Sequence, residues 1–197
     1  MSLILRQIEA LSETKLNYRL GFVVDSICGI LLLGVGVSSH GGEPVFILVS
    51  VVLGYLYLTF LEYCIHRILF HWGPPNLFNS GHQKHHDDPK VLLALPFVFG
   101  VSLTAAHYYA FGWLFPGVDP TIFLGTLLFG YFVYGVVHHA QHYFTFHNRL
   151  WLRLLNHHTL HHVYPDKNYG VTTTLWDHVF FTYQKSLPTR ANHQGAL

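Results

Sequence analysis

Four long runs of apolar residues dominate the chain, at about residues 20–37, 45–61, 91–115 and 121–137. A helix needs about 17 to 25 residues to cross the hydrocarbon core of a bilayer. Each run is long enough, although Asp25 interrupts the first, and Pro96 and His107 the third. The links at 38–44 and 116–120 are short and contain glycine or proline. The pattern therefore predicts four transmembrane helices arranged as two hairpins.

Residues 1–19 have a different pattern, in which apolar and charged positions alternate with helical spacing. Ile4, Ile8 and Leu11 recur at intervals of three or four among charged residues. This spacing predicts an amphipathic helix that lies in the membrane interface, with a frayed N-terminal tail as the alternative. The charges exclude a cleaved secretory signal.

Composition agrees with a membrane protein of the all-α class and a single domain over residues 1–197. Hydrophobic residues make up 51% of the 197 residues and charged residues only 11%. The formal charge of +1 leaves no basic excess for binding nucleic acid. Cys28 and Cys64 both lie in or near apolar runs, which excludes a disulfide scaffold.

The positive charges predict the orientation of the helices. All eleven Lys and Arg residues precede the first run, lie between the second and third, or follow the fourth. Because positive residues favour the cytoplasmic side, both termini and the polar segments 62–90 and 138–185 are expected there. The membrane that the helices span is expected to be the inner membrane if the source is bacterial, or that of the endoplasmic reticulum if it is eukaryotic. These segments are expected to form a cap on the bundle.

Histidine is the anomaly, because the chain has 17 and fourteen of them fall within 65–86 and 138–178. Each predicted hairpin ends in a histidine pair on a helical extension and is followed by a His-x-x-His-His cluster. Residues three or four apart share one face of a helix, so most members of each set project together. His66 and His71 are five apart, which requires either that the helix frays or that each serves a different ion.

Ten imidazoles exceed what one tetrahedral zinc ion needs and predict two metal ions, each with about five nitrogen ligands. The expected ligands are His66, His71, His82, His85, His86, His138, His142, His158, His161 and His162.

Several further residues are candidates for holding these ligands in place. Glu62 and Asp177 sit among apolar residues and need partners, and His139 and His157 are neighbours or register alternatives of the ligands. The expectation for Asp87 and Asp88 is a solvated surface. His147 and His178 fit a supporting role and a surface role equally well, whereas His40, His107 and His193 are expected to be unrelated to the site.

The sequence excludes two common enzyme classes. It has no His-Glu-x-x-His motif, so the zinc-protease interpretation lacks its general base, and it has no glycine-rich nucleotide motif. A membrane metal transporter or metal store is the alternative from another class, but a transporter is expected to place its ligands near the membrane midplane.

The ordered histidine clusters resemble the fatty acid hydroxylase and sterol desaturase superfamily, and most closely its fatty acid 2-hydroxylase branch. The segments 66–71, 81–86, 138–142 and 157–162 are similar to its four histidine boxes, and 168–182 is similar to its closing segment with Trp176, Asp177 and Thr182. The resemblance covers about residues 50–185 and implies the same ten ligands.

The resemblance implies O2-dependent hydroxylation of a fatty acyl chain at C2, in lipid biosynthesis. It implies two iron ions, with zinc as a plausible inactive replacement on isolation. Because no cytochrome b5 module is fused within this sequence, a separate ferredoxin-like or cytochrome b5-like donor is expected. A carotenoid or sterol substrate, or desaturation, is the alternative within the superfamily.

Overall fold

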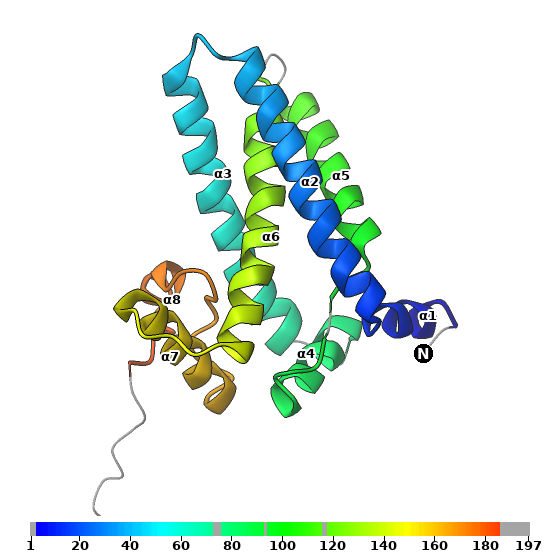
Figure 1. Ribbon diagram of the computed structural model, residues 1–197, viewed down its shortest axis with the longest axis vertical. Coiled ribbons are helices and arrows are strands. Elements are labelled where there is room, and N and C mark those ends of the chain that lie inside the picture. The colour runs from blue at the N-terminus through cyan, green and yellow to red at the C-terminus, as the bar shows by residue number, and fades with distance from the viewer. Residues whose placement is uncertain (1–2, 73–75, 93, 116–117, 186–197) are drawn as a thin grey trace, which may run out of the picture.

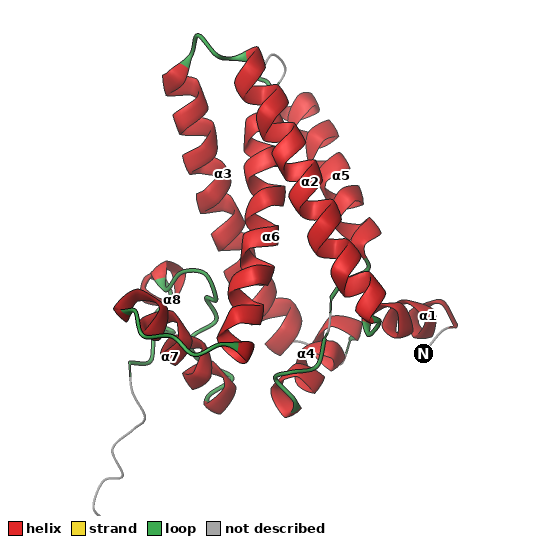
Figure 2. Ribbon diagram, viewed as in Figure 1, coloured by secondary structure: helices red, strands yellow, loops and turns green. Residues whose placement is uncertain are grey.

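The computed structural model describes residues 3–72, 76–92, 94–115 and 118–185, and every regular element in these ranges is a helix. Four long helices run along the longest dimension as a bundle (Figures 1 and 2). They are α2 (Lys15–Ser39), α3 (Pro44–Cys64), α5 (Phe97–Leu114) and α6 (Thr121–Tyr143). The remaining helices gather at one end: α1 (Leu3–Ser12), η1 (Ile65–His71), α4 (Leu77–Asp87), α7 (Arg149–Val163) and α8 (Leu175–Val179). The predicted all-α class is confirmed.

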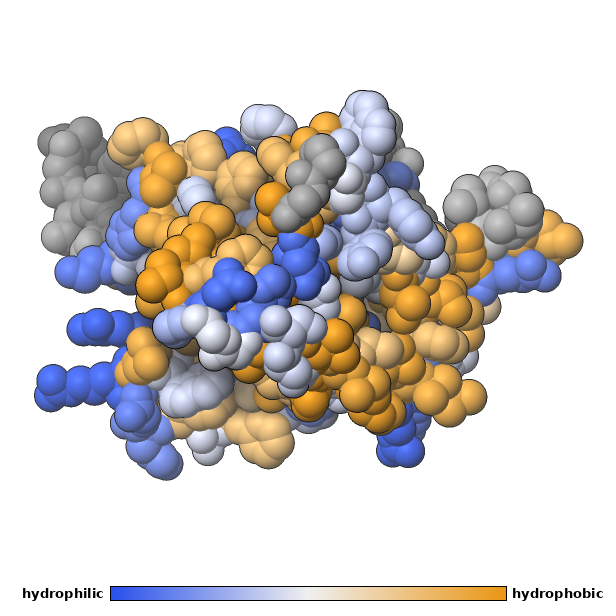
Figure 3. All heavy atoms as spheres, turned by 90° about the horizontal axis from the view of Figure 1, so that it is seen from above, coloured by the Kyte–Doolittle hydropathy of each residue, from blue (hydrophilic) through white to orange (hydrophobic). Residues whose placement is uncertain are grey.

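Three helical stretches are long and apolar enough to cross a membrane: Lys15–Ser39, Pro44–His71 and Thr121–Tyr143. They correspond to the first, second and fourth predicted spans. Helix α5 has 18 residues, includes His107, and packs beside α2 and α6, and its role as a fourth span stays a prediction. Seen from above, the molecule shows large apolar areas with hydrophilic residues between them and along one edge (Figure 3).

The expected helix over residues 1–19 breaks at residues 13–14. Helix α1 ends at Ser12, and α2 starts at Lys15, five residues before the expected span at 20–37. The Thr14 hydroxyl accepts a hydrogen bond from the backbone N–H of Asn17 at 3.1 Å. This N-terminal cap satisfies a free backbone donor, and it therefore fixes the start of a new helix.

The third apolar run also starts its helix later than expected, at Phe97 and not at residue 91. Proline at position 96 disfavours helical geometry in the residue before it. The buried Asn17 side chain then donates to the carbonyl oxygens of Ala94 and Leu95 and accepts from the backbone N–H of Phe97. Residues 94–96 are therefore part of a connection without regular structure, which Asn17 attaches to the start of α2.

Helix α6 is the centre of the bundle and contacts α2, α3 and α5. Glycines allow the close approach. A Cβ atom built on Gly29 of α2 would lie 2.6 Å from the backbone nitrogen of Phe129, and one on Gly125 of α6 would lie 2.7 Å from that of Leu33. The backbones of α2 and α6 therefore pack against each other with no room for a side chain between them.

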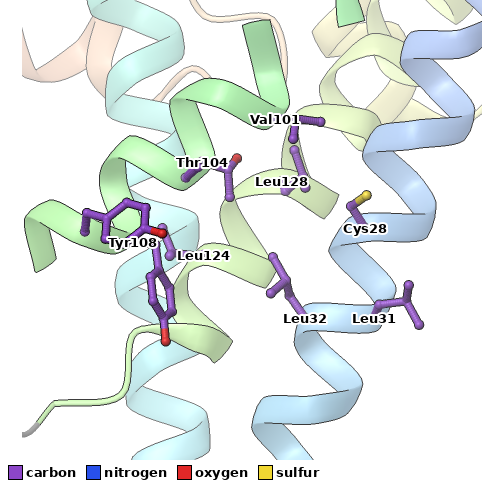
Figure 4. Close-up of a pocket in the computed structure, with 10 residues that line it drawn as sticks. Cys28, Leu31, Leu32, Val101, Thr104, Tyr108, Leu124 and Leu128 are labelled. Atoms are coloured by element: carbon purple, nitrogen blue, oxygen red, sulfur yellow. The ribbon is translucent and has the colours of Figure 1, made fainter. Parts of the chain in front are cut away.

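A cavity of about 410 Å³ opens between α2, α5 and α6. Cys28, Leu32, Thr104 and Leu128 are among its lining residues, and most of the others are apolar (Figure 4). None of the ten expected metal ligands lines it. Leu128 precedes His138 by ten residues on α6, which is about 15 Å along the helix axis. This cavity is therefore separate from the histidine clusters.

The glycine contacts make a direct prediction about stability. Replacing Gly29 by Ala places a methyl group against the backbone of α6, and we expect this overpacking to cost about 1–3 kcal/mol of unfolding free energy. Gly34 of the same helix has open space around its Cβ position, so Gly34→Ala is the matched control and is expected to be neutral or slightly stabilising. Thermal unfolding in detergent measures both, and equal unfolding temperatures for the two variants would contradict the packing argument.

Candidate metal centre

The ten histidines that the sequence predicts as ligands converge at one end of the bundle. The first group contains His66, His71, His82, His86 and His161, and the second contains His85, His138, His142 and His158. Within each group, one ring nitrogen of every member lies within 4.8 Å of those of the others. His162 adjoins the second group, with its Nε2 atom 3.2 Å from Nε2 of His158.

Each of the two groups contains one histidine from the other half of the chain. Helix α4 supplies His82 and His86 to the first group but turns His85 toward α6 and the second group. Helix α7 supplies His158 to the second group but turns His161 toward η1 and the first. Each group is therefore complete only when both halves of the chain are packed together.

Helix η1 resolves the unusual spacing of His66 and His71. It is a π-helix, in which backbone hydrogen bonds join residues five apart and the turn is wider than in an α-helix. Residues at positions i and i+5 then lie nearly on one face. Both histidines belong to the first group, so neither fraying nor a separate ion for each is needed.

Backbone carbonyls fix which ring nitrogen two of the histidines present to the first group. Nδ1–H of His66 donates to the carbonyl oxygen of Tyr169 at 2.5 Å, and Nδ1–H of His161 donates to that of Lys167 at 2.7 Å. Because a neutral imidazole carries one N–H, Nε2 of each ring keeps its lone pair. Those two Nε2 atoms point into the group, 3.0 Å from Nε2 of His82 and 3.1 Å from Nε2 of His71.

The spacing between the nitrogens fits a cation at the centre of each group. Neighbouring Nε2 atoms lie 2.9–3.1 Å apart in the first group and 2.9–3.3 Å apart in the second, including His162. Metal–imidazole bonds of about 2.1 Å at right angles place two nitrogens about 3.0 Å apart, whereas a tetrahedral arrangement places them about 3.4 Å apart. The spacing therefore fits nitrogens that could share a metal ion, with up to five histidines available to each of the two ions.

Burial keeps these imidazoles in the neutral form that binds metals. Burial, reinforced by the neighbouring histidines, lowers the pKa of His85 and of His162 to about 3. For the same reasons the pKa of His82 and of His158 lies well below the ordinary value of 6.5. A ligand that has already lost its proton binds a metal ion without competition from protons near neutral pH.

Asp177 organises the segment that carries the Tyr169 carbonyl. Its fully buried carboxylate accepts hydrogen bonds from the backbone N–H groups of Tyr169 and Gly170, from Nε2–H of His157 and from the Thr182 hydroxyl. Burial acts to raise the pKa of Asp177, but these hydrogen bonds outweigh it and hold the pKa below the ordinary value. Asp177 is therefore ionised, and it positions His66 through Tyr169.

Glu62 acts on the same segment, and not on an imidazole as the sequence suggested. Its Oε1 atom accepts hydrogen bonds from the backbone N–H groups of Val171 and Thr172 at 2.6 and 3.0 Å. Its Oε2 atom accepts one from the Thr172 hydroxyl at 2.6 Å. Glu62 and Asp177 therefore hold residues 169–172 from two sides.

The other candidate histidines lie outside both groups. His157 donates to Asp177, and His139 contacts the Tyr18 hydroxyl through Nδ1 at 2.9 Å. His147 and His178 are exposed, as are Asp87 and Asp88. His40, just after α2, contacts Asp119, just before α6, and His107 of α5 contacts Tyr57 of α3, as expected for residues unrelated to the centre. His193 lies outside the described residues.

The sequence did not identify the carbonyls of Lys167 and Tyr169, because a backbone oxygen leaves no mark on residue type. One signal was present in the likeness of residues 168–182 to a known closing segment. A second observation accompanies it in the structure, where Asn168 has a left-handed φ of 57° and its side chain donates to the His157 carbonyl. That bond fixes the turn between the two carbonyls.

Comparison with known proteins places these histidines in a familiar context. The sequence profile of the fatty acid hydroxylase family matches residues 51–182. The chain is 39% identical over 144 residues to the fatty acid 2-hydroxylase of Mus musculus, covering 66% of this chain and 38% of that protein. It is 34% identical over 141 residues to the dihydroceramide fatty acyl 2-hydroxylase FAH2 of Arabidopsis thaliana, covering 67% of this chain and 59% of that protein.

A solved structure has the same fold. It is full-length scs7p, of which only the hydroxylase domain is visible, with a TM-score of 0.73 and 27% sequence identity over 89% of this chain and 69% of that one. The chain thus spans well under two thirds of the length of the mouse and plant relatives.

The role of Asp177 makes a prediction about the fold around the centre. Asp177→Asn replaces one accepting oxygen by an NH2 group that faces buried donors, and each donor left unsatisfied is expected to cost about 1–3 kcal/mol. The unfolding temperature of the metal-free protein is therefore expected to fall. Asp166→Asn removes the same charge from a carboxylate that is 78% exposed and is the matched control. If both variants unfold at the wild-type temperature, Asp177 does not organise the segment.

Proposed function

Because the chain belongs to the fatty acid hydroxylase family, we propose that it is a membrane oxidoreductase that uses O2 to hydroxylate the acyl chain of a lipid, at C2. One observation carries this proposal. Two adjacent groups of buried or half-buried imidazoles lie at one end of a bundle of apolar helices. Amino-acid side chains alone do not oxidise an unactivated C–H bond, so the chemistry requires a redox cofactor at such a site.

The proposed ligands are the five histidines of the first group for one ion, and the four of the second group with His162 for the other. Imidazole suits iron, zinc, copper and nickel alike, so the donor set does not select the metal. The redox reaction favours iron over zinc. When bound, two iron ions would supply the electron transfer that lets O2 attack a C–H bond.

The protein residues hold this centre rigidly at the edge of the hydrocarbon layer. The carbonyls of Tyr169 and Lys167 orient His66 and His161, and the interlocked helices α4 and α7 hold the two groups side by side. A lipid whose polar head stays at the membrane interface brings the carbons next to its carbonyl to this level. That geometry supports C2 as the position attacked, because deeper positions require the chain to bend out of the bilayer.

We further propose that the histidine end faces the cytoplasm, since all eleven Lys and Arg residues flank the spans on that side. Electrons would then come from a separate cytoplasmic donor, ferredoxin-like or cytochrome b5-like.

The metal proposal is tested with variants of the two exchanged histidines. His161→Ala is expected to lower bound metal from two ions toward one per chain by weakening the first site, and His85→Ala by weakening the second. His147 is exposed and lies in neither group, so His147→Ala is the control and keeps both ions. Elemental analysis after dialysis against a weak chelator measures this. A wild-type protein without stoichiometric metal would refute the proposal.

The reaction is tested by supplying 18O2 to membranes that contain the protein and fragmenting the product lipid by mass spectrometry. Label at C2 of an acyl chain is the expected result, and His138→Ala is expected to give none. Label on a sterol or carotenoid ring would transfer the activity to another lipid class of the same superfamily. Product formed without oxygen would remove the oxygenase proposal.

A further inference from the structure

Arg67 lies next to His66 on η1, and aromatic rings surround its guanidinium group. Its Cζ atom is 5.0 Å from the ring centroid of Trp72 and 5.9 Å from those of Tyr63 and Tyr169. One N–H, on Nη1, donates to the Tyr63 hydroxyl at 2.8 Å. Among the described residues, no carboxylate lies within ion-pair distance of Arg67. Its charge is therefore stabilised by rings and not by an anion.

The neighbouring charges explain why no anion of the protein fills this position. Lys84, on the nearby helix α4, pairs with both Glu9 and Glu13 of α1. Glu62 is the acidic residue nearest to Arg67 in the sequence, but its carboxylate accepts hydrogen bonds from Val171 and Thr172. The guanidinium group has five N–H donors, and an aromatic face does not occupy its edges.

Arg67 lies at the level of the lipid headgroups. The stretch Pro44–His71 is apolar and 28 residues long. Arg67 is 23 residues beyond Pro44, or about 35 Å along the axis at 1.5 Å per residue. The hydrocarbon core is about 30 Å thick, so the guanidinium group falls just outside it. Trp72 is 59% exposed at the same end, a position where tryptophan is enriched in membrane proteins.

We propose that Arg67, with Tyr63 and Trp72, binds the oxyanion of a lipid headgroup, a carboxylate or a phosphate, beside the metal centre. The planar guanidinium fork matches two oxygens of either group. The Trp72 and Tyr63 rings restrict its orientation and exclude water from one side. The site is independent of hydroxylation, because it requires only that a lipid of the surrounding leaflet carries an acidic head.

A chain of hydrogen bonds connects this site to the first histidine group. The Thr182 hydroxyl must donate to the Asp177 carboxylate, which only accepts. The Tyr63 hydroxyl, 3.1 Å from Thr182, must therefore donate to Thr182 and accept from Arg67. The Tyr169 ring is also close to both groups, with its centroid 5.9 Å from Cζ of Arg67 and 5.8 Å from the centroid of the His66 imidazole. A bound headgroup would thus lie within one aromatic ring of the centre.

Native mass spectrometry in a neutral detergent tests lipid binding without turnover. The metal-loaded protein is mixed with a fatty acid, a phosphatidic acid and a ceramide of matched chain length. Wild type is expected to retain each acidic lipid about tenfold more strongly than the ceramide, as loss of a charged hydrogen bond predicts. Arg67→Gln is expected to abolish the difference and Arg67→Lys to reduce it. Arg153→Gln removes the same charge from an exposed position on α7 and is expected to keep it.

Three results would overturn the proposal. Equal loss in Arg67→Gln and Arg153→Gln would indicate attraction to net charge only. Displacement of the lipid by inorganic phosphate at equal concentration would indicate a free-anion site and not a headgroup site. The third is a Trp72→Ala variant that keeps the wild-type preference for acidic lipids over ceramide. This variant removes one ring beside Arg67 but keeps the hydrogen bonds from Arg67 to Asp177. It therefore tests the proposal even if Arg67→Gln does not fold. Because binding is read without O2, failure here leaves the proposed hydroxylation open, and an inactive enzyme that still selects acidic lipids leaves the headgroup site standing.

Discussion

The exchange of His85 and His161 between the two histidine groups is the constraint on which the rest of the structure depends. Each half of the chain carries five of the ten imidazoles, but each group takes one member from the other half, so α4 and α7 must lie next to each other at the end of the bundle. That position is set by the helices above them, in which α6 packs on α2 and α3 through glycine contacts. The geometry of the centre thus depends on the packing of the bundle, because a shift of one helix would separate nitrogens that lie about 3 Å apart.

Imidazole positions alone do not define a centre, since each ring must also present the correct nitrogen. A second layer supplies that selection through the carbonyls of Lys167 and Tyr169, and those carbonyls depend in turn on Asp177 and Glu62. Two buried carboxylates in an apolar chain are costly unless they are satisfied by donors. Here many of the donors are backbone N–H groups of one short segment. Their hydrogen bonds offset the cost of desolvating the carboxylates, and they also fix the segment that carries the Tyr169 carbonyl.

Sequence reasoning identified the ten imidazoles because helical spacing is local, and positions three or four apart share a face whatever the tertiary fold. It did not divide them between two groups, because the division depends on how α4 and α7 meet, which is a property of packing between distant segments. The late start of the helix at Phe97 has the same origin, since its backbone N–H donates to Asn17, which is 80 residues away in the sequence. The break at Thr14 depends on a local cap instead. The π-turn at His66 and His71 left a signal, the five-residue spacing, but its meaning required the backbone.

The depth of the histidines bears on the class of reaction. Ionisable groups that carry an ion across a membrane are expected near its midplane on broken helices. Asp25 and His107 are the acidic and basic residues inside the apolar runs, and neither belongs to a histidine group. The imidazoles instead lie on η1, on α4, in the last turns of α6 and on α7, at the same end of the bundle as Arg67 and Trp72. A centre at the end of the bundle lies beside the proposed headgroup site, which agrees better with the proposed reaction on a lipid than with transport of an ion across the membrane.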